Sequence, residues 1–186
     1  MCIRDRSCWI PKSERLNILR KAAGLIREQR ESLAVQAASE GGKPLVDSLV
    51  EIDRAADGVE CCVEEIRTSA GNVIPMQIDG TSSSKVAFTQ YEPIGVVAAV
   101  SAFNHPFNLI VHQVAPAVAT GCPVLVKPAA STPLSCKAFI DILTEAGLPQ
   151  GWAQMVLPEN IELATCLLYT SPSPRDLSTS RMPSSA

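Results

Sequence analysis

The longest apolar stretch of the chain, Ile94–Val126, contains no charged side chain. It is nevertheless interrupted by polar residues, prolines and a glycine: Asn104, His105, Pro106, His112, Gln113, Pro116 and Gly121. A membrane-spanning helix needs about 20 consecutive, mostly apolar residues, so these interruptions argue against a membrane span. We therefore expect the stretch to form the buried core of a globular domain.

Apolar runs of strand length alternate with helix-like segments across residues 94–165. The run Val96–Ser101 is continuous, which is typical of a strand covered on both faces. The other expected elements are a helix ending at Gly121, a strand over Pro123–Lys127, a helix from Thr132-Pro133 to Gly147, and a strand over Gln154–Leu157. The order β-α-β-α-β with short connections predicts the first half of a doubly wound, Rossmann-like parallel sheet in an α/β fold.

Residues 7–72 predict a helical region that precedes the sheet. The first helix is expected to begin with Ser13 as its N-cap, and the second, Arg30–Glu40, to end at Gly41-Gly42. A third helix opens at Pro44 and is expected to close at Gly71. Its acidic residues predict a solvated face and not a metal site: Asp47, Glu51, Asp53, Asp57, Glu60, Glu64 and Glu65.

Residues 73–93 predict a β-ribbon between the helices and the sheet. Two strand-like runs, Val73–Ile78 and Lys85–Tyr91, flank a turn that begins at Asp79-Gly80.

The two ends of the chain differ in character from the rest. Residues 166–186 are rich in Ser, Pro and Thr, a composition typical of disorder. Residues 1–6 and 166–186 both resemble translated sequencing adapters. We therefore expect neither end to belong to the fold and the natural protein to continue past Thr165; a natural flexible tail is the alternative.

Charge and cysteine content exclude several classes of protein. The net charge of −3 provides no basic footprint for nucleic acid. The seven cysteines are odd in number and include no Cys-x-x-Cys pair, so reduced thiols are expected and a disulfide framework is not. We expect a cytoplasmic protein.

Ligands in an open parallel sheet bind beyond the carboxyl ends of the strands, which directs attention to Asn104 and Lys127. No G-x-G-x-x-G motif follows either strand. Lys127 ends an apolar strand with no carboxylate nearby in sequence, so it either meets a ligand or extends its ammonium to the surface. Asn104 either serves the site or closes an Asx turn.

Three sequence runs of the chain resemble those of a known family. They are EPIGVVAAVSAFNHPFNL, APAVATGCPVLVKPAASTPLS and EAGLP, and in order and spacing they resemble the aldehyde dehydrogenase superfamily. ERLNILRKAAGLI and EGGKPL resemble its helical N-terminal segment. The likeness covers nearly all of residues 7–165.

The resemblance implies catalytic roles for two residues. Asn104 matches the asparagine that donates its side-chain amide to the oxyanion of the thiohemiacetal, and Lys127 matches the lysine that binds the adenosine ribose of the cofactor. The residues expected along the cofactor are Val100, Ser101, Ala102, Phe103, Ala129 and Ala130. Many members of the superfamily have a carboxylate where Ala130 stands, so its absence makes NADP permissible beside NAD.

The resemblance also implies an oxidoreductase that converts an aldehyde to a carboxylic acid with NAD or NADP. None of the seven cysteines matches the nucleophile, so this chain by itself is expected to be an inactive, truncated part of the enzyme. The ribbon matches an oligomerisation arm, which implies a homodimer or homotetramer of the complete protein. A member that transfers the acyl group to coenzyme A, and a non-catalytic member of the same fold, are the alternatives.

Overall fold

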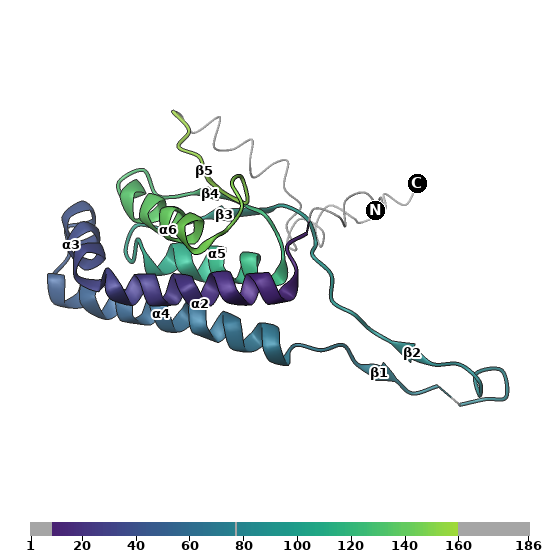
Figure 1. Ribbon diagram of the computed structural model, residues 1–186. Helices are drawn as coiled ribbons and strands as arrows, with labels where there is room; N and C mark the ends of the chain where they lie inside the picture. Colours follow the sequence, from purple (N-terminus) through teal and green to yellow (C-terminus); the bar gives the residue numbers. More distant parts are fainter. Residues whose placement is uncertain (1–8, 77, 160–186) are drawn as a thin grey trace, which may run out of the picture.

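The computed structural model describes residues 9–76 and 78–159. Its N-terminal part consists of three helices: α2 (Lys12–Glu28), α3 (Arg30–Gly41) and α4 (Leu45–Thr68). α2 and α4 lie side by side along their lengths (Figure 1). Their apolar stripes face inward, with Leu19, Ile26 and Val59 wholly buried. α2 begins one residue before Ser13, with Pro11 as its N-cap, so the predicted serine cap is wrong.

The second part is the predicted parallel sheet with its crossover helices. β3 (Val97–Val100), β4 (Val124–Lys127) and β5 (Ala153–Met155) pair in that order, and both pairings are parallel. α5 (Asn108–Thr120) connects β3 to β4, and α6 (Pro133–Ala146) connects β4 to β5. Both helices end where predicted, at Gly121 and Gly147, which adopt the left-handed conformation that favours glycine.

The helices of the described chain cover one face of this sheet. Ala99, Val124 and Val126 point to that face and are buried. On the other face Val100 is 44% exposed, and its partner Lys127 is half-buried. The prediction that Val96–Ser101 is covered on both faces is therefore wrong for this chain, because no described helix covers the face on which Ala98 and Val100 are exposed.

An aromatic contact in the core joins the two crossover helices. Phe107, at the start of α5, meets Phe139 of α6 edge to face, with the ring centroids 5.7 Å apart. Such a contact stabilises the fold by about 0.5–1.5 kcal/mol beyond the burial of the two rings. Both phenylalanines are wholly buried, so they belong to the core between the two crossover helices.

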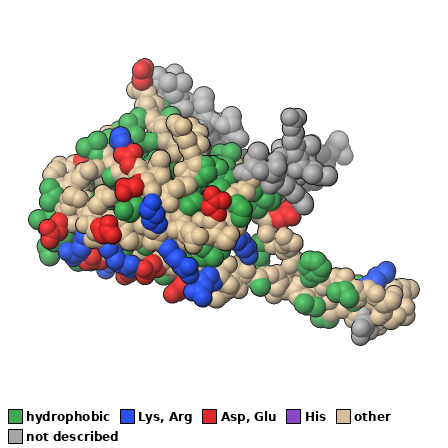
Figure 2. Space-filling view, viewed as in Figure 1, with side chains coloured by type: hydrophobic (Ala, Val, Ile, Leu, Met, Phe, Trp, Pro, Cys, Tyr) green, Lys and Arg blue, Asp and Glu red, His purple; other side chains and the backbone are tan. Residues whose placement is uncertain are grey.

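The ribbon extends away from the rest of the molecule (Figure 1). β1 (Val73–Ile74) pairs antiparallel with β2 (Ala87–Phe88), and both strands are shorter than the predicted runs. Its apolar side chains lack cover in the single chain: Val73, Ile74, Ile78, Val86, Phe88 and Tyr91. Figure 2 shows hydrophobic side chains on the surface of the ribbon.

Gly71 has a different role from the one predicted. α4 ends at Thr68, so Gly71 does not cap it. A Cβ at Gly71 would collide with the main-chain carbonyl of Thr89 on the returning strand. The amide of Thr89 also donates to the carbonyl of Asn72 over 2.9 Å. Glycine at position 71 therefore allows the two arms of the ribbon to approach each other at its base.

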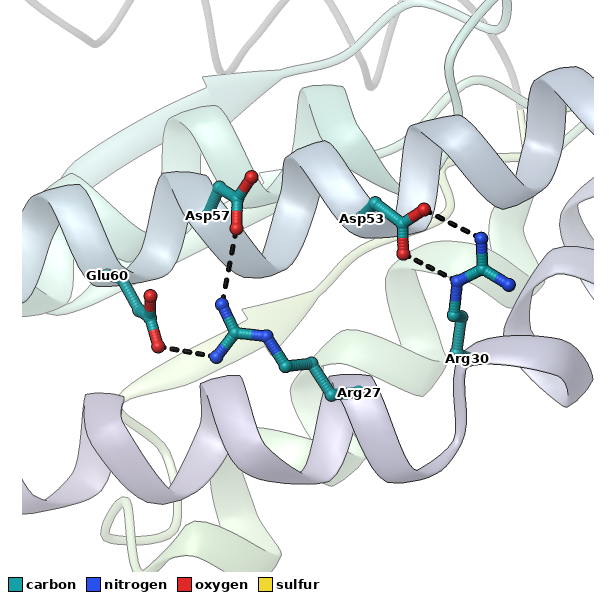
Figure 3. A network of polar contacts seen from close by, with 5 residues as sticks. All are labelled: Arg27, Arg30, Asp53, Asp57 and Glu60. Atoms are coloured by element: carbon teal, nitrogen blue, oxygen red, sulfur yellow. Dashed lines mark hydrogen bonds and ion pairs between the residues drawn. The ribbon is translucent and has the colours of Figure 1, made fainter.

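Part of the acidic face of α4 forms ion pairs with the preceding helices (Figure 3). Arg30 makes a two-pronged contact with Asp53, over 2.5 and 2.7 Å, and lowers the pKa of that carboxyl. Arg27 contacts both Asp57 and Glu60. These side chains are 39–72% exposed, so they add modestly to stability. Glu51 does not belong to this face, because its side chain is buried.

Two further expectations concern membrane spans and the two ends of the chain. Among the described helices, none combines the length and apolar character needed to cross a membrane. The expectations for residues 1–6 and 166–186 concern segments outside the described residues.

Candidate functional site

The carboxyl ends of β3 and β4 lie side by side, as predicted. Val100 and Lys127 are register partners, and the amide of Ser101 donates to the carbonyl of Lys127 over 3.0 Å. The segments that follow the two strands therefore leave the same edge of the sheet. This is the edge at which open α/β sheets bind ligands.

The loop after β3 carries the predicted oxyanion residue. Ala102, Phe103 and Asn104 are exposed, whereas Ser101 is buried. Within the described chain, the Asn104 side chain makes no hydrogen bond. Asn104 therefore does not close an Asx turn. Its amide is free to donate to a ligand.

Lys127 is half-buried at the end of β4, beside its register partner Val100. Its Nζ atom donates to the carbonyl of Pro128 over 3.3 Å, and among the described residues no carboxylate pairs with it. Ala129 is half-buried and Ala130 is exposed. The surface beside Lys127 thus has one positive charge and, at position 130, no acidic group. A lysine ammonium has the chemistry to pair with an anion or to donate to hydroxyl groups.

A side chain from α5 holds the end of β3. The Nε2 atom of Gln113 donates to the carbonyl of Val100 over 2.9 Å. Sequence reasoning treated Gln113 only as an interruption of an apolar run. Because polar residues in buried helices need partners, its position within that run was a usable signal.

The N-termini of both crossover helices are occupied by carboxylates from the helical part. Glu40 of α3 accepts from the amides of Leu134 and Ser135, over 2.8 Å each. Glu51 of α4 accepts from the amides at the start of α5. Helix N-termini often bind phosphate, but here protein carboxylates take these amides. Neither of these helix ends has its first amides free for the phosphates of a dinucleotide.

Sequence reasoning missed both of these carboxylates. Glu51 lies three residues after Ser48 and four before Ala55, and both neighbours are wholly buried. Helical spacing therefore placed Glu51 on the inner stripe of α4, which was the available signal.

Burial makes Cys122 and Cys136 poor nucleophiles. Both side chains are buried, and desolvation raises the pKa of Cys136 to about 12. All four described cysteines are free thiols. The described ranges contain no group of three His, Cys, Asp or Glu side chains placed to hold a metal ion.

Comparison with known proteins identifies the family. The profile described as "Aldehyde dehydrogenase family" matches residues 9–178, a range that runs past Thr165. A 3-sulfolactaldehyde dehydrogenase from Priestia aryabhattai is 37% identical over 155 residues, which is 83% of this chain and 32% of the relative.

Solved structures agree with this match. An NADP-dependent glyceraldehyde-3-phosphate dehydrogenase from Bacillus halodurans C-125, complexed with NADP, is 32% identical with a TM-score of 0.80, over 86% of this chain and 34% of its own. An NAD-dependent benzaldehyde dehydrogenase from Corynebacterium glutamicum is 29% identical with a TM-score of 0.77, again over 86% and 34%.

The chain spans about a third of the length of the relatives it matches. Over that third, both the sequence and the fold match those of the relatives. The chain therefore belongs to the aldehyde dehydrogenase family.

Proposed function

We propose that this chain is the N-terminal part of an NAD(P)-dependent enzyme that oxidises an aldehyde to a carboxylic acid. The observation that carries the proposal is the juxtaposition of the Val100 and Lys127 strand ends, with the exposed Asn104 loop leaving from one of them. This chain contributes a hydrogen-bond donor for the reacting oxygen and part of the cofactor surface.

Asn104 stabilises negative charge on the substrate oxygen in this proposal. Its side-chain amide is exposed and unpaired within the described chain, so donation to a ligand costs no existing hydrogen bond. One such donor, aimed at charge that develops in the transition state, lowers the barrier by about 3–4 kcal/mol. The thiolate that attacks the aldehyde and the general base come from the remaining two thirds of the complete enzyme.

Lys127 binds the cofactor in this proposal. The residues present fit such a group, because the ammonium has only a carbonyl partner in the described chain and Ala130 leaves its surroundings without an acid. A bound nicotinamide would supply the hydride acceptor. Lys127 positions the ribose, while Val100, Ser101, Ala102, Phe103 and Ala129 line its path.

Both NAD and NADP are compatible with this surface. A carboxylate at position 130 would repel a 2′-phosphate, whereas alanine does not. The relatives named above include one described as NAD-dependent and one complexed with NADP. Lys127 has no carboxylate to neutralise it in the described chain, so it can pair with a 2′-phosphate when one is present.

Two variants of the complete enzyme test this assignment. Asn104→Ala should lower kcat by about 10²–10³-fold with little change in the KM for the cofactor. Lys127→Ala should mainly raise the KM for the cofactor. Steady-state kinetics with each substrate varied measure both constants, and the reverse pattern would show that the two roles are exchanged.

Product analysis separates the proposal from its alternatives. The expected product is a carboxylate that forms at the same rate with and without coenzyme A. An acyl-coenzyme A product would identify a coenzyme A-acylating aldehyde dehydrogenase instead. No reduction of NAD or NADP with any of a broad panel of aldehydes would indicate a non-catalytic member of the family.

A further inference from the structure

Glu51 is the most completely buried acidic residue of the described chain. Its side chain is 0% exposed, and it projects from the second turn of α4 toward the start of α5. An unpaired buried carboxylate costs several kcal/mol, so its partners determine what it does.

Glu51 has two kinds of partner. Some belong to the loop–helix segment that follows β3, and Lys43 neutralises the charge of the carboxylate. Its Oε1 atom accepts from the amides of Phe107 and Asn108, over 2.8 and 2.9 Å. Its Oε2 atom contacts the ammonium of Lys43, which is itself mostly buried, and lies 3.8 Å from Nδ1 of His105. α5 has no local side-chain cap, so the carboxylate of α4 satisfies its first free amides.

The Asn104 loop is consequently fixed at both of its ends. On the strand side, the amide of Ser101 is bonded to Lys127 of β4. On the helix side, the amides of Phe107 and Asn108 are bonded to Glu51. The exposed residues between these anchors include Asn104, whose own side chain contributes no anchor.

We propose that Glu51, neutralised by Lys43, is a positioning residue that holds the Asn104 amide in the direction of the reacting oxygen. The inference rests on the role proposed above for Asn104. Glu51 touches neither substrate nor cofactor in this account and acts only through the loop. A displacement of about 1 Å in a group that contacts the reacting atoms can cost about a hundredfold in rate, so a loosened anchor has a measurable effect.

A double-mutant cycle in the complete enzyme tests this coupling. Glu51→Ala should lower kcat by about ten- to a hundredfold and leave the KM for the cofactor within about twofold of the original. Adding Glu51→Ala to Asn104→Ala should lower kcat little further, because the side-chain amide that Glu51 positions is already absent. A purely structural role would instead multiply the two losses.

Glu40 provides the matched control. It caps α6 with two amide contacts of the same kind, and within the described chain no hydrogen bond or ion pair joins its side chain to the Asn104 loop. Glu40→Ala combined with Asn104→Ala should therefore give the product of the two single effects on kcat.

A conservative variant keeps the test decisive if Glu51→Ala does not fold. Glu51→Gln retains a carbonyl oxygen for the amides of Phe107 and Asn108 but removes the charge that pairs with Lys43. It should lose less activity than the alanine variant, and that loss should also disappear in the Asn104→Ala background.

The outcomes separate the two proposals. If Asn104→Ala lowers kcat but the Glu51 effect multiplies with it, the positioning role is wrong and the role of Asn104 stands. If Asn104→Ala leaves kcat unchanged, the role of Asn104 is wrong and the inference about Glu51 is wrong with it.

Discussion

The carboxylate of Glu40 accepts a hydrogen bond from the amide of Ser135 over 2.8 Å, although the two residues lie 95 positions apart in the chain. Its other oxygen accepts from Leu134 over the same distance. α3 thereby caps α6, in which Thr132 occupies the N-cap position without a capping hydrogen bond from its side chain.

Removal of this cap should destabilise the fold. Glu40→Ala leaves two amides of the first turn of α6 without their partner, and loss of a helix cap typically costs about 1 kcal/mol. We expect the free energy of unfolding, measured by urea denaturation, to fall by about that amount. Glu31→Ala, an acidic residue on the exposed side of the same helix, is the control. An unfolding free energy of Glu40→Ala equal to that of the original protein would show that the cap contributes nothing.

A carboxylate at position 130 should shift cofactor preference. In the complete enzyme, Ala130→Glu places a negative charge beside the proposed ribose site, so kcat/KM with NADP should fall by about tenfold or more relative to NAD. Steady-state kinetics with the two cofactors measure this ratio. Gln150→Glu adds the same charge in the loop before β5, at the opposite edge of the sheet, and should leave the ratio unchanged. An unchanged ratio in Ala130→Glu would remove position 130 from the cofactor surface.

The ribbon should mediate association of the complete enzyme. Phe88 is 69% exposed and Val86 is 85% exposed, and apolar surface of this kind is stabilised by burial against another copy. Val86→Lys combined with Phe88→Lys should convert the proposed homodimer or homotetramer to smaller species, as measured by sedimentation velocity. Val46→Lys alters an apolar residue on α4 that is 65% exposed and should leave the assembly intact. Identical sedimentation of all three proteins would exclude the ribbon from the interface.

The thiol of Cys136 should resist alkylation in the folded protein. Desolvation raises its pKa from 9.0 to about 12, so the reactive thiolate is scarce at pH 8. Peptide mapping after iodoacetamide treatment should find Cys61, which is exposed, modified first, and Cys136 modified only after denaturation. Rapid labelling of Cys136 at pH 8 would contradict its burial.

The same pKa shift has a consequence for stability. Below pH 9 the thiol is neutral in both states, so it has no effect on the pH dependence there. Between pH 9 and about 12 the unfolded chain loses this proton and the folded chain keeps it, so stability should fall as pH rises. Cys136→Ala should make the decline in unfolding free energy with pH less steep over this range.

The sequence by itself determined the order of elements and the edge at which the candidate site lies. Alternating apolar runs and helix-like segments, punctuated by Gly121 and Gly147, predict parallel strands, and parallel strands place the ends at Val100 and Lys127 together. These are local patterns: each depends on residues a few positions apart, whose periodicity and turn preferences can be read directly.

Only the tertiary structure decided which polar groups meet. Glu51 contacts Phe107 and Asn108 from 56 and 57 positions away. Whether an acidic residue lies at the surface or caps a buried helix depends on its partners. Local sequence patterns do not predict partners at such a distance along the chain. Gly71 shows the same limit: it reads as a helix end, but the chain requires it because Thr89 passes close by. Periodicity specifies which side of a helix faces inward, whereas packing between distant segments decides what each inward group touches.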